Sequence, residues 1–401
     1  MRRLLVVLAA CASAPAHVES SSPSALDRYL APVVAAHEMS GVVLIRHGDR
    51  VDVRSYGMAN REHAVLNRRD TRFLIGSISK QFTAAAILIL EQQGKLALTD
   101  HLDKFIADFP SGGDITLLQM LQHRSGISRD MTSEADYTVG HSLDELADII
   151  KKQPLAFPPG TKEGYSNNAY KLLAYIVEKV SGQPFGELLR HALFDPLGMT
   201  NTGELEPLTL VPHLAEGYSP GFGPEAFGPS PVLAISNARG AASLYSTVDD
   251  LDRWSSELST GAVLKAVRDK MLAGDGIGIG VVTRDGHRAI SHDGVYQGYT
   301  GFFEQYPDDH VTIIYLGNTE TAPTVTPLQR ALEAIAFGQS PAPFQPHARG
   351  TSVPADVQAD YLGVYEFFPG FSVTVKRIAG QLALGTAEGM YPLEWQGRDS
   401  L

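Results

Sequence analysis

Ser77 and Lys80 stand three residues apart, just before a long apolar stretch that runs from Gln81 to Gln93. This stretch is rich in alanine and leucine and contains no glycine or proline, which predicts a buried helix. Residues i and i+3 share one face of a helix, so the lysine amine would lie beside the serine hydroxyl. A serine is a weak nucleophile until a neighbouring base takes its proton, and a partly neutral lysine can be that base. The pair also fits a helix-capping serine followed by a surface lysine one turn on.

Two later segments extend this pattern. Tyr165-Ser-Asn167 follows a break of prolines and glycine at 158–160, and Ser291-His-Asp-Gly294 lies among β-rich runs. With the first pair, they occur in the order of the three active-site motifs of the penicillin-recognising serine hydrolases, which this sequence therefore resembles. The Tyr-x-Asn motif makes the resemblance closer to class C β-lactamases and their relatives, which include D-alanyl-D-alanine carboxypeptidases, D-aminopeptidases and β-lactamase-like esterases. The resemblance covers residues 25–337 and includes the connecting segments Leu121–Ile127, Phe157–Gly160, Asp195–Met199 and Gly240–Thr247.

The resemblance implies acyl transfer through a covalent acyl-enzyme, with no metal or organic cofactor. Ser77 is then the nucleophile, and Lys80 holds or accepts its proton. Tyr165 would ordinarily lose its proton at about pH 10, but a nearby lysine ammonium would lower its pKa. We therefore treat Lys80 and Tyr165 as a coupled pair that shares one proton. Water activated near Tyr165 would release the acyl group.

Further roles come from the resemblance alone. Asn167 would contact the substrate amide and the lysine, and the backbone N–H groups of Ser77 and Val295 would form the oxyanion hole. Structural alternatives remain for the second motif. Tyr165 also fits a buried aromatic residue with a bonded hydroxyl, and Asn167 fits a cap before the helix expected at 169–180.

The third motif departs from the β-lactamase pattern. Class C β-lactamases have Lys-Thr-Gly where this chain has His292, Asp293 and Gly294. On an edge strand His292 and Gly294 would face one way, and Gly294 would let the substrate lie close to the backbone. Histidine is only partly charged at neutral pH, so it would hold a substrate carboxylate less strongly than lysine does. This favours an esterase or a D-peptidase over a dedicated β-lactamase, although His292 also fits a core-facing strand residue.

Two other patterns look like functional motifs but have the wrong context. Gly217–Gly221 fits G-x-S-x-G with Ser219 as the nucleophile, but a loop-like sequence follows where that motif needs a helix. Gly276–Gly280 is glycine-rich like a phosphate loop, but its spacing is wrong, and we expect a strand that lines the cleft. No H-E-x-x-H occurs and Cys11 is the only cysteine, so we expect no metal site.

The elements around these residues predict a mixed fold. β-rich runs at 41–45 and 51–56 indicate a hairpin, and helices follow across the middle of the chain. The runs from 278 to 316 predict antiparallel strands, and residues 328–336 a closing helix. Strands and helices are thus segregated, which is typical of the α+β class. The resemblance implies the β-lactamase/transpeptidase-like fold, an antiparallel sheet flanked by helices plus an all-helical region.

We expect four parts along the chain. Residues 1–16 form an export signal, 25–338 the serine hydrolase domain, 339–354 a linker, and 355–401 a small β-rich unit. The linker is proline-rich. The last unit has roughly three or four short strands, few for a self-standing barrel, which leaves open whether it is complete.

The first residues leave two export routes open. Two arginines precede an apolar run that is too short to span a bilayer, as in an export signal. Leu8-Ala-Ala-Cys11 resembles a lipoprotein box in which Cys11 would carry a lipid anchor, whereas Ala12-Ser-Ala14 and Ala14-Pro-Ala16 fit ordinary signal cleavage. We favour soluble export, to the periplasm or the cell exterior, because the apolar run is short. With a single cysteine, no disulfide supports the fold.

Composition narrows the choice of partners. The 401 residues are 44% hydrophobic, enough for a large core, and the net charge is −12. Because no run of lysines and arginines occurs, we expect no nucleic-acid partner. The expected substrate is a small molecule or peptide, namely an ester, a D-peptide or a β-lactam; the sequence does not indicate an oligomeric state. The alternative function is a penicillin-binding sensor or scaffold module with little or no turnover.

Overall fold

The computed structural model describes residues 24–131, 138–220, 227–320, 322–346, 351–368, 371–378, 380–386 and 389–395. The export signal predicted at 1–16, with Cys11, lies outside these described residues. Within them, no helix has the length and apolar character needed to cross a membrane.

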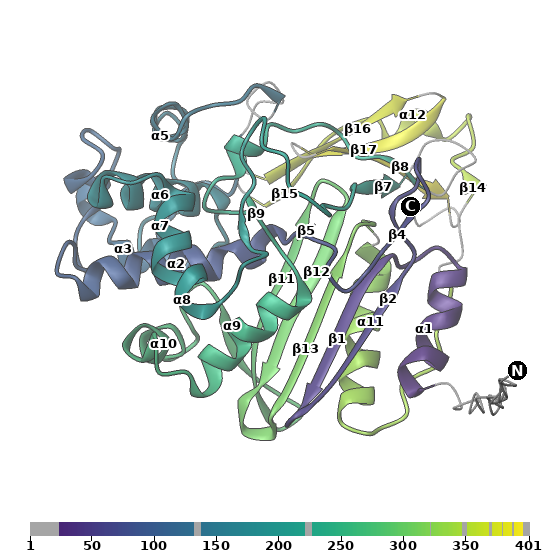
Figure 1. Ribbon diagram of the computed structural model, residues 1–401. Helices are drawn as coiled ribbons and strands as arrows, with labels where there is room; N and C mark the ends of the chain where they lie inside the picture. Colours follow the sequence, from purple (N-terminus) through teal and green to yellow (C-terminus); the bar gives the residue numbers. More distant parts are fainter. Residues whose placement is uncertain are drawn as a thin grey trace, which may run out of the picture.

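A six-stranded antiparallel sheet forms the centre of the protein, in the order β10-β11-β12-β13-β1-β2 (Figure 1). Its strands are β1 (Gly41–His47), β2 (Arg50–Tyr56), β10 (Gly280–Arg284), β11 (His287–Tyr296), β12 (Tyr299–Tyr306) and β13 (Val311–Gly317). β1 pairs with β13 in a register that places Gly41 opposite Gly317. The N-terminal hairpin and the late strands, which the sequence predicts separately, therefore belong to one sheet.

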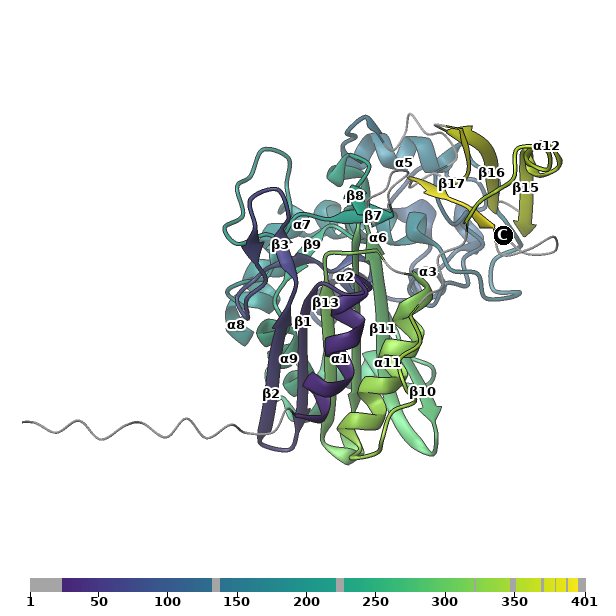
Figure 2. The same cartoon turned by 90° about the vertical axis from the view of Figure 1, so that its right-hand side faces the viewer.

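Successive side chains of a strand point to opposite sides of the sheet, and on the central strands each set packs in its own hydrophobic cluster. On β1, Val43 packs in the cluster formed with α1 (Ala25–Ala35) and α11 (Ala322–Ala336). Val42 packs in the larger cluster on the other face, which includes residues of α2 (Ser79–Gln92), α9 (Val248–Thr260) and α10 (Lys265–Met271). The sheet thus lies between two helical layers, and Figure 2 shows α1 and α11 together on one of its faces. This arrangement confirms the predicted α+β class.

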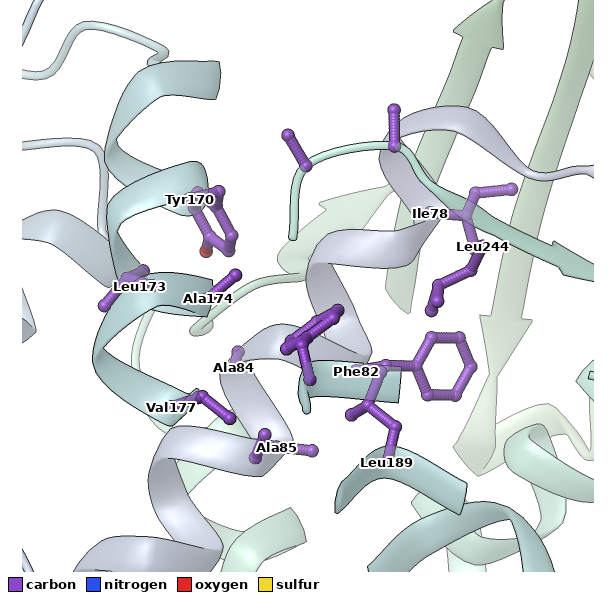
Figure 3. Packing of buried hydrophobic residues seen from close by; sticks show 14 of the residues in the cluster. Ile78, Phe82, Ala84, Ala85, Tyr170, Leu173, Ala174, Val177, Leu189 and Leu244 are labelled. Atoms are coloured by element: carbon purple, nitrogen blue, oxygen red, sulfur yellow. The ribbon is translucent and has the colours of Figure 1, made fainter. Parts of the chain in front are cut away.

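Helix α2 lies between the sheet and a mainly helical region. Residues 79–90 of this helix are all buried, which confirms the predicted buried helix. Small side chains allow close packing here: Ala84 and Ala85 lie beside Ala174 and Val177 of α6 (Figure 3). The helical region comprises α3 (Leu117–Leu121), α5 (Leu143–Lys151), α6 (Asn167–Ser181), α7 (Phe185–Leu189) and α8 (Asp195–Leu197).

Short strands connect these layers. β9 (Leu244–Ser246) pairs with both β5 (Phe73–Leu74) and β6 (Gly203–Glu204), and so holds the segment that leads into α2. The other short strands are β3 (Met58–Asn60), β4 (Val65–Leu66), β7 (Tyr218–Pro220) and β8 (Phe227–Pro229).

The C-terminal residues form a small sheet of their own. Four antiparallel strands follow in order, β15 (Gly363–Phe368), β16 (Phe371–Ile378), β17 (Gln381–Thr386) and β18 (Gly389–Pro392), and β14 (Thr351–Ser352) pairs with β19 (Glu394–Trp395). Val353, Val375 and Leu382 are buried together beneath them, and α12 (Gln358–Tyr361) lies nearby (Figure 1). The Tyr391 hydroxyl donates a hydrogen bond to the Glu320 carboxylate. This contact links the small sheet to the chain just after β13. The domain and linker boundaries stay predictions.

Candidate active site

Ser77 lies in a tight turn that two strands hold in place. β5 pairs with β9, and the N–H of Ile75 then donates to the carbonyl of Leu244 at 2.9 Å. Gly76 follows in the left-handed region, with φ +51°, where glycine carries no steric penalty. Ser77 sits in the resulting 3₁₀ turn, Gly76–Ile78, and the capping residue of α2 is Ile78. The helix-capping interpretation of Ser77 is therefore wrong.

Lys80 points at Ser77 from the first turn of α2. Its Nζ donates to Ser77 Oγ at 2.9 Å and to the carbonyl oxygen of Ala241 at 3.0 Å. The side chain is fully buried, so the surface-lysine interpretation is also wrong. A buried amine bonded to a serine hydroxyl is the arrangement that can take up the serine proton.

Tyr165 joins this pair from the loop before α6. Lys80 Nζ lies 4.9 Å from the centroid of the Tyr165 ring, and Arg129 Cζ lies 5.2 Å from the same centroid. Two cations thus face one aromatic ring. Tyr165 is half-buried, which does not fit the alternative of a buried aromatic residue.

His123 is a site residue that the sequence interpretation missed. Its imidazole stacks on Tyr165, with ring centroids 4.3 Å apart and an interplanar angle of 28°. Burial, and then the charge of Lys80, lower the pKa of His123 to about 3. The residue lies inside Leu121–Ile127, a segment that carried the family resemblance, but no spacing in the sequence pairs it with Tyr165.

Asn167 is the first residue of α6 and does not cap it. Ser166 is the cap, because its Oγ accepts the N–H of Ala169 at 2.9 Å. The capping interpretation of Asn167 is therefore wrong, and its side chain has another partner. Asn167 Nδ2 donates to Asp130 Oδ1 at 2.7 Å, and Arg129 Nε donates to Asp130 Oδ2 at 3.1 Å.

Asn167 and Asp130 share a pocket with the serine. The residues that line it are Ser77, Asp130, Asn167, Lys171, Asn237, Ala238, Ala241, Ala242, Val295 and Tyr296. The structure therefore brings Ser77, Asn167 and Val295 to one cavity, as the three motifs predict. It adds Asp130, which nothing in its sequence neighbourhood distinguishes.

The third motif lies on the second half of β11, which does not pair with β10. β10 pairs with β11 only as far as Ser291, so residues 292–296 border β12 on one side and an open edge on the other. The expectation of an edge strand is thus correct for these residues, although β10 covers the first half of β11.

The register decides which amides face the open edge. β11 and β12 are joined by a two-residue turn, Gln297 and Gly298, whose φ angles of +48° and +80° fit a type I′ turn. Tyr296 and Tyr299 are then a hydrogen-bonded pair, and the bonds to β12 fall on every second residue. The N–H of Val295 therefore points to the open edge.

Glycines bring this edge against the Ser77 turn. A Cβ on Gly294 would lie 2.1 Å from the carbonyl oxygen of Ile75, and a Cβ on Gly76 would lie 2.7 Å from the nitrogen of Val295. Only glycine at both positions allows so close an approach of the two backbones. The backbone of Gly294 and Val295 therefore lies directly against the turn that carries Ser77.

His292 faces the site from β11. Its ring centroid is 6.5 Å from that of Tyr165, and the side chain is half-buried, so the core-facing interpretation is wrong. Nδ1 is 2.7 Å from the carbonyl oxygen of Asp293; because a carbonyl only accepts, Nδ1 carries the proton. Burial, and then the charge of Lys80, lower the pKa of His292 to about 4. The ring is therefore neutral at pH 7.

The two misleading motifs have structural roles. Ser219 lies in β7, where its Oγ is 2.8 Å from Ser230 Oγ and donates to Glu320 Oε2 at 3.1 Å. In the run Gly276–Gly280, only Gly280 belongs to a strand, so the strand predicted there is wrong. Gly276 and Gly278 have φ angles of +97° and +70°, and a Cβ on Gly278 would lie 2.4 Å from Ala84 Cβ. This glycine run is a turn packed against α2.

Comparison with known proteins agrees with this geometry. The family model described as Beta-lactamase matches residues 26–336. The chain belongs to the beta-lactamase family. Penicillin-binding protein 4* of Bacillus subtilis (strain 168) is 28% identical over 388 residues, which cover 87% of this chain and 86% of that protein. PbpX of the same strain is 32% identical over 219 residues, which are 55% of this chain and about half (54%) of that protein's length.

Solved structures share the fold. A penicillin-binding protein from Bacillus halodurans superposes with a TM-score of 0.66 at 27% identity, covering 76% of this chain and 99% of that one. The D-amino acid amidase from Ochrobactrum anthropi SV3, complexed with D-phenylalanine, gives a TM-score of 0.70 at 22% identity, covering 79% and 99%. The predicted β-lactamase/transpeptidase-like fold is therefore confirmed, and the family is one of serine hydrolases.

Proposed function

We propose that this protein hydrolyses small esters or amides through a covalent acyl-enzyme on Ser77. The observation that carries the proposal is the 2.9 Å bond from Lys80 Nζ to Ser77 Oγ in a site shared with Tyr165. A nucleophile, a buried base and a second proton carrier are thereby in one place, which acyl transfer requires.

In the first half of the reaction, Ser77 Oγ attacks the carbonyl carbon of the substrate. Its proton passes to the Lys80–Tyr165 pair, and the carbonyl oxygen becomes an oxyanion. The N–H groups of Ser77 and Val295 are the proposed donors to that oxygen, and the close approach of β11 to the Ser77 turn supports this assignment. The carbon–oxygen or carbon–nitrogen bond then breaks, and the leaving group takes the proton from the pair.

In the second half, water attacks the acyl-enzyme. The same pair takes a proton from the water, the oxyanion forms again at the same donors, and the proton returns to Ser77 Oγ as the acid leaves. Residues already placed around Ser77 supply every proton transfer in both halves.

The neutral imidazole of His292 favours substrates that carry no carboxylate at this position. A neutral imidazole offers a substrate carboxylate no charge, unlike a lysine in the same position. We therefore propose neutral esters and D-amino acid derivatives as substrates ahead of carboxylate-bearing β-lactams. The fold shared with a D-amino acid amidase supports the second class.

The test of the acyl-enzyme is an intact-mass measurement with a p-nitrophenyl ester and with a β-lactam. We expect one acyl adduct on the wild type and none on Ser77→Ala. Ser79→Ala is the matched control, because Ser79 is buried in the same segment and its Oγ accepts the N–H of Leu244. An equal adduct on Ser77→Ala would rule out the proposal.

The test of turnover uses four substrates: a chromogenic cephalosporin, a D-Ala-D-Ala peptide, a D-amino-acid amide and a short-chain ester. We expect the ester and the D-amino-acid amide to give the highest kcat/KM. A stoichiometric burst without turnover on all four would instead support a penicillin-binding sensor, which the altered third motif also fits.

The cellular location is a separate proposal that rests on residues 1–16 alone. We propose export, because a basic start and a short apolar run precede small residues. Mass spectrometry of the mature N-terminus would distinguish cleavage with a lipid on Cys11 from cleavage at the alanines that follow. An uncleaved N-terminus starting at Met1 would overturn the proposal.

A further inference from the structure

His123 binds the chain on both sides of Tyr165. Its carbonyl oxygen accepts the N–H of Gly164 at 2.8 Å, and its ring Nδ1 accepts the N–H of Ser166 at 3.1 Å. The same ring stacks on Tyr165 at 4.3 Å. One residue therefore fixes both amides that flank Tyr165 and covers one face of its ring.

The imidazole of His123 also packs against Tyr170. Its ring centroid is 5.1 Å from that of Tyr170 on α6, and the Tyr170 hydroxyl donates to the carbonyl of Leu121 at 2.8 Å. Tyr170 is fully buried, so it belongs to the rigid core of the helical region. Tyr170, His123 and Tyr165 thus form an aromatic column that extends from the core to the catalytic site.

We propose that His123 is the positioning residue of Tyr165, which keeps the phenol beside Lys80 so that the two can exchange the Ser77 proton. This inference rests on the proposed function. It assigns His123 no contact with substrate and no proton of the reaction, because it acts through the position of the Tyr165 ring.

The geometry requires a neutral ring. Nδ1 can accept the Ser166 N–H only while it carries no proton, so the proton of the neutral imidazole lies on Nε2. Charging the ring would break this bond and would add a cation near Lys80 and Arg129, the same groups that lower the pKa of His123. His123 therefore stays in one tautomer across the pH range in which a hydrolase works.

The backbone conformation selects the informative substitution. His123 has φ +56°, a left-handed value that asparagine tolerates better than most residues. His123→Asn therefore removes the stacking ring with little backbone strain, and it keeps an acceptor near the Ser166 amide.

The experiment measures the acylation rate with p-nitrophenyl acetate for wild type, His123→Asn, Tyr165→Phe and the double variant. A displacement of about 1 Å at a reacting group costs roughly 100-fold, so we expect His123→Asn to slow acylation by about 10- to 100-fold, with little change in KM. The acidic limb of its kcat/KM profile should move to higher pH, because a displaced phenol is less stabilised as the anion by Lys80. In the Tyr165→Phe background the same substitution should change the rate less than about twofold.

Other outcomes would overturn the inference. An equal loss from His123→Asn in both backgrounds would mean a purely structural role, and wild-type acylation by the single variant would mean no role. If Tyr165→Phe alone acylates like the wild type, the proposed function of Tyr165 fails first. Nitrogen-15 NMR of the wild-type imidazole needs no variant: a proton on Nδ1, or titration near the ordinary pKa of about 6.5, would contradict the proposed role of His123.

Discussion

Replacing Gly294 with alanine tests whether catalysis needs the close contact between β11 and the Ser77 turn. The added Cβ would lie 2.1 Å from the carbonyl oxygen of Ile75 and 3.0 Å from its carbonyl carbon. Carbon and oxygen atoms normally approach to about 3.3 Å. Either the strand or the turn must therefore move by roughly 1 Å, and both are backbone segments that carry a proposed oxyanion donor.

The expected effect follows from that displacement. Loss of one oxyanion donor lowers kcat by roughly 100- to 1,000-fold, and a 1 Å error in placement costs about 100-fold. We therefore expect kcat/KM of Gly294→Ala for a p-nitrophenyl ester to fall by about 100- to 1,000-fold. Overpacking of this kind costs about 1–3 kcal/mol of folding stability, so the protein should remain folded with a Tm lower by a few degrees.

Gly280→Ala is the matched control in the same sheet. The nearest atom to its added Cβ is the carbonyl oxygen of Ser291 at 3.4 Å, an ordinary contact, and its backbone is not left-handed. Steady-state kinetics and thermal unfolding should show this variant within about twofold of the wild type. If folded Gly294→Ala keeps wild-type kcat/KM, the N–H of Val295 is not an oxyanion donor.

Three further predictions concern ionisable side chains. Lys80→Met keeps the volume but removes the amine, so the acylation rate in stopped flow should fall by about 100- to 10,000-fold, and near-normal acylation would exclude Lys80 as the base. His292→Lys should raise kcat/KM for a carboxylate-bearing cephalosporin relative to a neutral ester; an unchanged ratio in the folded variant would contradict our account of recognition. Glu304 is fully buried, and burial, with the neighbouring charge of Glu333, raises its pKa to about 8. Protonated Glu304 therefore stabilises the folded protein below its ordinary pKa of about 4.5, and this stabilisation is lost as pH rises toward 8. Calorimetric Tm should fall with pH less steeply in Glu304→Gln than in the wild type. Tm values that fall in parallel with pH in the two proteins would refute this.

Site residues can be predicted from the sequence where they lie close together along the chain. Ser77 and Lys80 are neighbours in one turn, so helical spacing alone brings them together. The α+β class could also be predicted, because segregated strands and helices leave few ways to bury their apolar faces. Tyr165 and His292 were found through motif order, and the structure places both rings around the same lysine.

Other site residues depend on contacts that local patterns do not encode. His123 reaches Tyr165 only because the two loops that carry them exchange backbone bonds, one of which is the N–H of Gly164 on the carbonyl of His123. Asp130 joins the site by bonding Asn167, across 37 residues of sequence. Neither residue has a helical or strand spacing to any motif, so only the tertiary structure reveals them.

The glycine run before β10 shows how the site depends on where a strand ends. Gly276 and Gly278 hold left-handed turns against α2, so β10 begins only at Gly280 and pairs with β11 no further than Ser291. If β10 continued, its backbone would bond the amides of Asp293 and Val295, because the register directs both to that side. The open edge is therefore created by this turn, and the run that looks like a phosphate loop in the sequence leaves the N–H of Val295, the proposed oxyanion donor, unpaired by β10.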